Sequence, residues 1–179
     1  MIYLFIANGS EECEALAPLD ILRRANVNIM TVGVGGKTVI GSHNVPIVCD
    51  IEESEIDFSC LEGIILPGGM PGTLNLEKSA VVQKAIDTSF SKNALICAIC
   101  AAPSILGHKG ILNGKKATCY PGFEKDLSGA NPLEIPVVSD GNIITANGPG
   151  SAFAFGLKIL EYLKGYEKSQ EIMHGMMIK

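Results

Sequence analysis

The chain has 179 residues, of which 47% are hydrophobic and 18% charged, and its formal net charge is −5. This length and composition allow a buried core without metal or disulfide support, which excludes a disordered chain and a small disulfide scaffold. The acidic balance, without a cluster of basic residues, argues against nucleic acid or an anionic membrane surface as a partner.

The first half of the chain predicts strands that alternate with helices. Ile2–Ala7 is predicted to be a strand rather than a signal peptide, because no basic residues precede it and Glu11 and Glu12 follow at once. We therefore expect a cytoplasmic protein with no membrane segment. A helix is predicted over Glu11–Ala25, with Ser10 as its N-cap. The further predicted elements are a strand at Asn28–Val34, a small hairpin of Thr38–Ile40 with Pro46–Asp50, a strand at Gly63–Leu66 and a helix at Ser79–Phe90.

The second half continues the same alternation. Ala94–Ile99 is a continuous apolar run that predicts a buried strand, and Ala101–Leu106, with an early proline, predicts the start of a helix. The remaining predicted elements are short strands at Lys116–Cys119, Val137–Ser139 and Ile143–Ala146 and helices at Ser151–Lys164 and Lys168–Met177. The pattern predicts a single α/β domain over residues 1–179, with a doubly wound, mostly parallel sheet flanked by helices and a small β-hairpin excursion.

Cys100 lies at the corner between the predicted strand and helix. Its sulfur should project beyond the carboxyl end of the sheet, where ligands bind in folds of this class. The free N–H groups at the start of the helix favour a thiolate, so we expect a lowered pKa and a nucleophile placed like the serine of an α/β-hydrolase elbow. The loops Asn8–Glu14 and Pro67–Thr73 should converge on the same edge.

Two nearby features can supply the rest of an active site. The Gly68–Gly69 pair follows a buried strand, so the Gly69 N–H, together with that of Ala101, can stabilise an oxyanion unless the loop is a plain turn. Glu14 either complements the helix dipole, as Glu11 and Glu12 do, or lies desolvated beside the sulfur. In the second case its pKa is raised and it carries a proton. Both interpretations of Glu14 remain open at this point.

Cys97 and Cys100 form a C-x-x-C motif. Residues three apart on a strand point to opposite faces, which argues against a redox pair or half of a zinc site. Without a second such motif or a histidine cluster, we expect no metal site. All six cysteines are expected to be reduced, with Cys60, Cys97 and Cys119 in the core.

Two further features are expected to play no catalytic part. The three histidines are predicted to be non-catalytic, and the middle one is expected at the C-terminal end of its helix; they are His43, His108 and His174. The Asn147–Gly150 turn is either an anion nest or only a connector.

Four segments occur in the same order and with similar spacing as in the ThiJ/PfpI superfamily: Glu11–Glu14, Leu66–Gly69, Ala98–Pro103 and Asn147–Gly150. The chain most resembles the branch of the Parkinson-disease-associated protein deglycase and its bacterial relatives, over essentially its whole length. The resemblance implies a flavodoxin-like fold and a homodimer. It also implies that Cys100 is the reactive cysteine, Glu14 the protonated carboxyl beside it, and Gly69 and Ala101 the backbone donors of the oxyanion hole.

The function implied by this resemblance is a cofactor-independent cysteine enzyme of the glyoxalase or protein deglycase type. Its substrate would be a small α-oxoaldehyde or a glycated protein. The alternative is a redox-sensing binding protein or chaperone whose cysteine oxidises to sulfinic acid. Ala101 stands where the protease branch has histidine, and Tyr120 precedes Pro121 where many relatives have histidine, so neither a peptidase nor a Cys–His relay is expected. No residue supports a role in thiazole biosynthesis.

Overall fold

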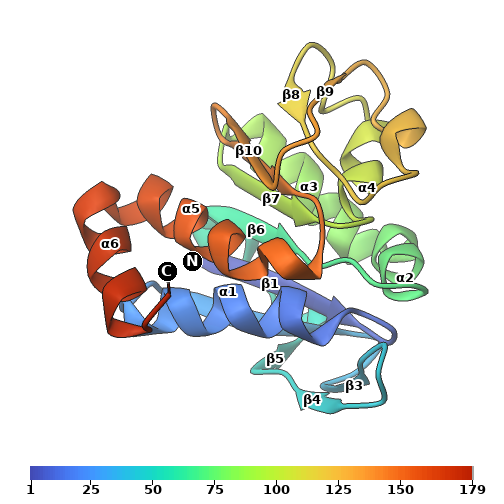
Figure 1. Cartoon of the computed structure of the whole chain (residues 1–179). Helices are drawn as coiled ribbons and strands as arrows, with labels where there is room; N and C mark the ends of the chain where they lie inside the picture. Colours follow the sequence, from blue (N-terminus) through green and yellow to red (C-terminus); the bar gives the residue numbers. More distant parts are fainter. Residues whose placement is uncertain (179) are drawn as a thin grey trace.

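A seven-stranded sheet lies at the centre of the computed structural model, which describes residues 1–178 (Figure 1). Its strands are β1 (Ile2–Ala7), β2 (Ile29–Val34), β5 (Ile51–Glu52), β6 (Gly63–Leu66), β7 (Leu95–Ile99), β10 (Val137–Asp140) and β11 (Ile143–Ala146). The order across the sheet is β10-β11-β7-β6-β1-β2-β5. All neighbouring pairs are parallel except β10 with β11. The expected doubly wound α/β architecture is confirmed.

Helices cover both faces of this sheet (Figure 1). They are α1 (Glu12–Arg24), α2 (Gly72–Lys78), α3 (Ala80–Ser91), α4 (Pro103–His108), α5 (Ala152–Lys164) and α6 (Tyr166–Gly175). Alternate residues of β1 enter separate cores: Leu4 and Ile6 belong to the core that includes residues of α1 and α5, and Phe5 to the core that includes residues of α3 and α4. A strand buried on both faces is apolar throughout. Within residues 1–178 no helix is long and apolar enough to cross a membrane.

The N-terminus of α1 differs from the prediction. The helix begins at Glu12, and Glu11 is its N-cap, because the Glu11 carboxylate accepts the N–H of Glu14 at 2.8 Å. The Ser10 hydroxyl accepts the N–H of Ala7 at 3.1 Å instead, and so closes the loop that follows β1. The predicted serine cap was therefore wrong, since the tertiary turn uses that hydroxyl.

The remaining differences concern short elements. The predicted hairpin is confirmed as β3 (Thr38–Ile40) paired with β4 (Pro46–Val48). The strand predicted at Lys116–Cys119 is only β8 (Lys116–Ala117), which pairs with β9 (Asn131–Pro132) outside the central sheet. Helix α2 begins inside the segment predicted as a loop. Elements of two residues, such as β5, β8 and β9, carry no readable periodicity.

The carboxyl ends of β1, β6 and β7 meet at one edge of the sheet, and the loops that follow them interlock there. The N–H of Glu11 donates to the carbonyl of Gly68 at 3.0 Å, and the N–H of Gly72 donates to the carbonyl of Gly9 at 3.1 Å. The predicted convergence of Asn8–Glu14 with the loop after β6 is therefore present.

Candidate active site

Cys100 occupies a sharp corner between β7 and α4. Its φ of 65° is a left-handed conformation, which costs a non-glycine residue ~1–2 kcal/mol. Two hydrogen bonds hold the corner: the Cys100 N–H donates to the Ala146 carbonyl at 2.9 Å, and its own carbonyl accepts the Tyr120 N–H at 2.8 Å. The strand–cysteine–helix corner predicted from the sequence is thus present, and neighbouring backbone over-determines its strained conformation.

The Cys100 thiol is buried, with 9% of the residue exposed. Burial and the negative charge of Glu14 raise its pKa to about 12, although hydrogen bonds from the Gly69 and Ala101 N–H groups act in the opposite direction. The expected lowered pKa is therefore wrong. Desolvation beside a carboxylate raises the pKa of the thiol more than the N–H groups at the start of α4 lower it. Helix α4 has only six residues and begins at Pro103.

Glu14 lies on the first turn of α1 and has no solvent exposure. Burial raises its pKa to about 7, while hydrogen bonds that the carboxylate accepts from the Cys100 thiol and the Gly68 N–H limit the rise. The Gly68 N–H donates to Oε2 at 2.8 Å. Among the described residues Oε1 has no hydrogen-bond partner. Of the two interpretations open for Glu14, the structure thus favours a desolvated carboxyl whose raised pKa lets it gain and lose a proton near neutrality.

Glu14 and Cys100 together hold one proton over a wide pH range. The pKa values of about 7 and about 12 mean that the carboxyl ionises first and that the thiol keeps its proton near neutrality. The arrangement is therefore a thiol next to a carboxylate that can accept its proton, rather than a free thiolate.

The glycines of the loop after β6 allow this close approach. A Cβ at Gly68 would lie 2.6 Å from the Cys100 Cβ and 2.8 Å from Glu14 Oε2. At Gly69, φ is 87° and a Cβ would lie 2.5 Å from the Glu11 nitrogen. Any larger residue would push the carboxyl and the thiol apart. The bond from the Gly68 N–H was not predicted from the sequence, although the paired glycines were the available signal for it.

Glu12 does more than complement the helix dipole. Its side chain accepts hydrogen bonds from the Ser42 hydroxyl at 3.1 Å and the His43 N–H at 2.8 Å, and its Oε2 lies 2.9 Å from His43 Nδ1. Burial opposes ionisation, but the bonds from His43 outweigh it and lower the pKa of Glu12 to about 2. The same bond raises the pKa of His43.

Potential metal ligands gather in one place within residues 1–178. Ligand atoms of Glu11, Glu12 and His43 all lie within 4.8 Å of one another. These groups already serve as a helix cap and an ion pair, at the turn between β3 and β4 rather than at the Cys100 sulfur.

The other cysteines and the histidines are not part of the Cys100–Glu14 pair. All six cysteines fall within residues 1–178 and are free. Cys97 is fully buried, as expected, but Cys60 is exposed, and its predicted place in the core was wrong because it is the last residue of a short 3-10 turn without buried residues. His108 ends α4 and pairs with Glu77 at 2.6 Å. His174 lies exposed on α6. The turn at residues 147–150 connects β11 to α5.

The whole chain is similar to known proteins. The model of the DJ-1/PfpI family matches residues 1–162. Protein dj-1beta of Drosophila melanogaster is 36% identical over 178 residues, which cover 98% of this chain and 95% of that protein. Glutathione-independent glyoxalase DJR-1.2 of Caenorhabditis elegans is 32% identical, with 96% and 92% covered. The solved structure of oxidized Toxoplasma gondii DJ-1 superimposes with a TM-score of 0.94 at 32% identity, covering 98% of this chain and 97% of that one.

Proposed function

The chain belongs to the DJ-1/PfpI family, and from this membership and the site geometry we propose that it is a cofactor-independent cysteine enzyme that converts small α-oxoaldehydes to 2-hydroxy acids. Its second class of substrate is proteins that carry early adducts of these aldehydes. The observation that carries the proposal is the buried Cys100 thiol, which is hydrogen-bonded to Glu14 and faced by the N–H groups of Gly69 and Ala101. A relative named as a glutathione-independent glyoxalase supports it.

The first step needs no free thiolate. As the Cys100 sulfur attacks the aldehyde carbon, an S–C bond forms and the carbonyl electron pair moves to oxygen. The Glu14 carboxylate accepts the thiol proton in the same step, so the thiol pKa of about 12 is no obstacle. The N–H groups of Gly69 and Ala101 stabilise the oxyanion. The product is a hemithioacetal.

The later steps use Glu14 again. Glu14 returns its proton to the hemithioacetal oxygen and then removes the hydrogen of the former aldehyde carbon as a proton, which leaves an enediolate. The hydroxyl proton passes to the neighbouring oxygen, Glu14 delivers its proton to the neighbouring carbon, and the product is the thioester of a 2-hydroxy acid. Water then cleaves the C–S bond, releases the acid and restores the thiol. Methylglyoxal plus water thus becomes lactic acid. An adducted aldehyde enters the same sequence once the amine has left its carbon.

Lactate formation from methylglyoxal tests this mechanism, because the product is not confused with the reversible decay of adducts. We expect Cys100→Ser to be inactive and Glu14→Gln to be slower by about 100-fold or more. The exposed Cys60→Ser is the control and should retain wild-type activity. In the wild type, kcat/KM should rise with pH through about 7 as Glu14 ionises. Full activity in Cys100→Ser would refute the mechanism.

A redox-responsive binding protein or chaperone is the second candidate, and the unpartnered Oε1 of Glu14 favours it. A protonated carboxyl there can donate to an oxygen of an oxidised Cys100. Two molecules of hydrogen peroxide convert the thiol to sulfinic acid and yield two of water. Mass spectrometry after mild peroxide treatment should find Cys100 oxidised ahead of the other five cysteines. Equal oxidation of all six would remove this candidate.

The predicted homodimer and cytoplasmic location complete the proposal. Family membership supports the homodimer. Light scattering coupled to size exclusion should give twice the mass of the 179-residue chain. A monomer at micromolar concentration would contradict the dimer.

A further inference from the structure

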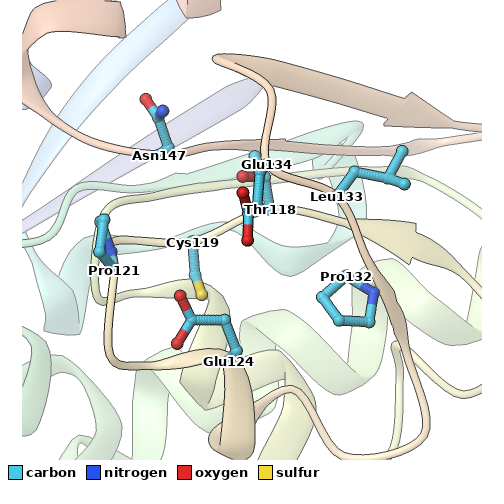
Figure 2. A pocket seen from close by; sticks show the side chains of 8 residues that line it. All are labelled: Thr118, Cys119, Pro121, Glu124, Pro132, Leu133, Glu134 and Asn147. Atoms are coloured by element: carbon cyan, nitrogen blue, oxygen red, sulfur yellow. The ribbon is translucent and has the colours of Figure 1, made fainter.

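A pocket of about 370 Å³ lies between the segment that follows β8 and the segment around β9 (Figure 2). Its walls are Thr118, Cys119, Pro121, Glu124, Pro132, Leu133, Glu134 and Asn147. The pocket is anchored to the corner on two sides. Tyr120, between Cys119 and Pro121, donates its N–H to the Cys100 carbonyl, and Ala146, just before Asn147, accepts the Cys100 N–H. Two wall segments of the pocket are therefore joined by hydrogen bonds to the backbone of the proposed nucleophile.

The charge of the pocket is negative. Glu124 and Glu134 line it and are both exposed, and no lysine, arginine or histidine among residues 1–178 lines it. Neither carboxylate forms an ion pair with a basic side chain among residues 1–178. Figure 2 shows the Glu124 carboxylate next to the sulfur of Cys119. Burial and the charges of Glu124 and Asp126 raise the pKa of Cys119 to about 11, which excludes a thiolate there at neutral pH.

The remaining lining combines apolar walls with neutral polar groups. Pro121, Pro132 and Leu133 offer apolar contact, and Thr118 and Asn147 offer hydrogen-bonding groups. Asn147 Oδ1 already accepts the Ser151 hydroxyl at 2.6 Å. A pocket with both carboxylates and apolar walls suits a positively charged group on an aliphatic stem. The stem is desolvated against the apolar walls, and the charged group pairs with the carboxylates.

We propose that this pocket binds an arginine or lysine side chain of a protein substrate, next to the glycated residue that reaches Cys100. The amine of the glycated residue itself is occupied by the aldehyde, so a neighbouring unmodified basic residue fills the pocket. The effect on turnover rests on the proposed function, whereas the binding itself does not.

Binding of a cation is tested without turnover. Nα-acetyl-arginine amide and Nα-acetyl-lysine amide are titrated into the protein by NMR, with Nα-acetyl-citrulline amide as the uncharged match for arginine. We expect at least one cation to bind about fivefold more tightly than citrulline amide and to shift the amide signals of Thr118, Leu133 and Asn147. The affinity should fall with added salt. Equal affinities for charged and uncharged probes, or no binding, would overturn the proposal.

A double variant, Glu124→Gln with Glu134→Gln, should abolish this preference. Glu167→Gln on α6, a helix that lies away from β8 and β9 in Figure 1, is the matched control and should keep it. In turnover, wild type should process a glycated peptide with a neighbouring arginine about fivefold faster in kcat/KM than the citrulline peptide, and the double variant should treat both alike. An unchanged preference in the double variant would overturn the assignment. If no substrate is turned over while the cation still binds, the proposed function fails and the pocket stands.

Discussion

At the scale of single residues, the buried carboxyl of Glu14 affects both the proposed chemistry and the way stability changes with pH. Glu14 has no solvent exposure, and its pKa is raised from 4.5 to about 7 in the folded protein. An acid with a raised folded pKa stabilises the fold while it is protonated. That contribution is complete below about pH 4.5 and is lost as the pH rises through about 7. The cost of ionising Glu14 in place is roughly 3 kcal/mol.

Glu14→Gln should remove this cost. The amide keeps the shape of the side chain and can accept the Gly68 N–H that Oε2 accepts at 2.8 Å. Urea unfolding at pH 8 should therefore show the variant more stable than wild type by up to roughly 3 kcal/mol, with a smaller difference at pH 5. The exposed Glu167→Gln serves as the control and should show no such pH dependence. The assignment would be contradicted if the gain in stability of the variant over wild type were smaller at pH 8 than at pH 5.

At the scale of elements, an ion pair fastens the β3–β4 turn to the start of α1. Glu12 accepts the His43 N–H and the Ser42 hydroxyl, so one side chain organises the turn. A Cβ at Gly41 would lie 2.2 Å from Glu12 Oε1, which shows how closely the turn and the helix approach. Because the pKa of Glu12 is lowered to about 2, its contribution is present above about pH 4.5 and is lost as the pH falls toward 2.

Glu12→Gln should loosen this turn without unfolding the protein. The variant cannot carry the negative charge that raises the pKa of His43, so the pKa of His43 should fall. Hydrogen exchange of the His43 amide, which donates to Glu12 at 2.8 Å, should quicken. NMR titration of the imidazole and exchange rates at pH 6 measure both effects. The exposed Glu55→Gln is a control. An unchanged His43 pKa would show that the pair contributes nothing in solution.

Helices α1 and α5 approach each other at Gly156. A Cβ there would lie 2.8 Å from the Pro18 Cα and 2.8 Å from the Ile21 Cδ1. We expect Gly156→Ala to lower the free energy of unfolding by ~1–3 kcal/mol, since backbone must move. Gly175→Ala, on α6 with open space around it, should be neutral or up to ~1 kcal/mol more stable. Urea denaturation compares the two, and equal stability would mean that the helices separate at little cost.

At the scale of the molecule, the central sheet joins both halves of the chain. β1 pairs with β2 and β6, and β11 pairs with β7, so N-terminal and C-terminal strands share one hydrogen-bonded layer. This continuity supports the proposal that residues 1–179 form one domain. Guanidinium unfolding followed by far-UV circular dichroism and by tyrosine fluorescence should give coincident transitions. Two separated transitions would contradict a single cooperative domain.

Much of the fold was predictable because a continuous apolar run of four or more residues by itself predicts a buried strand. Ile2–Ala7, Gly63–Leu66 and Ile143–Ala146 are strands with the predicted bounds. The place of Cys100 between a strand and a helix also follows from local pattern. Short elements failed, as with Lys116–Cys119, because two paired residues show no periodicity.

The electrostatics of the site were less predictable. The dipole of a nearby helix start favours a thiolate, and that argument led to a lowered pKa for Cys100. Burial and the Glu14 charge instead raise it to about 12, because desolvation depends on what surrounds the sulfur in space. The pocket with Glu124 and Glu134 was equally hidden, since its walls come from irregular segments.

The order of residues by itself determined where strands and helices form and that a cysteine lies at a strand–helix corner, since these follow from the pattern of neighbouring residues in the chain. Only the tertiary structure decided that the corner sulfur shares a proton with Glu14 and that two acidic side chains face a cavity beside it. Burial and charge change the pKa of a group through space. The residues that surround the Cys100 sulfur are far apart in sequence.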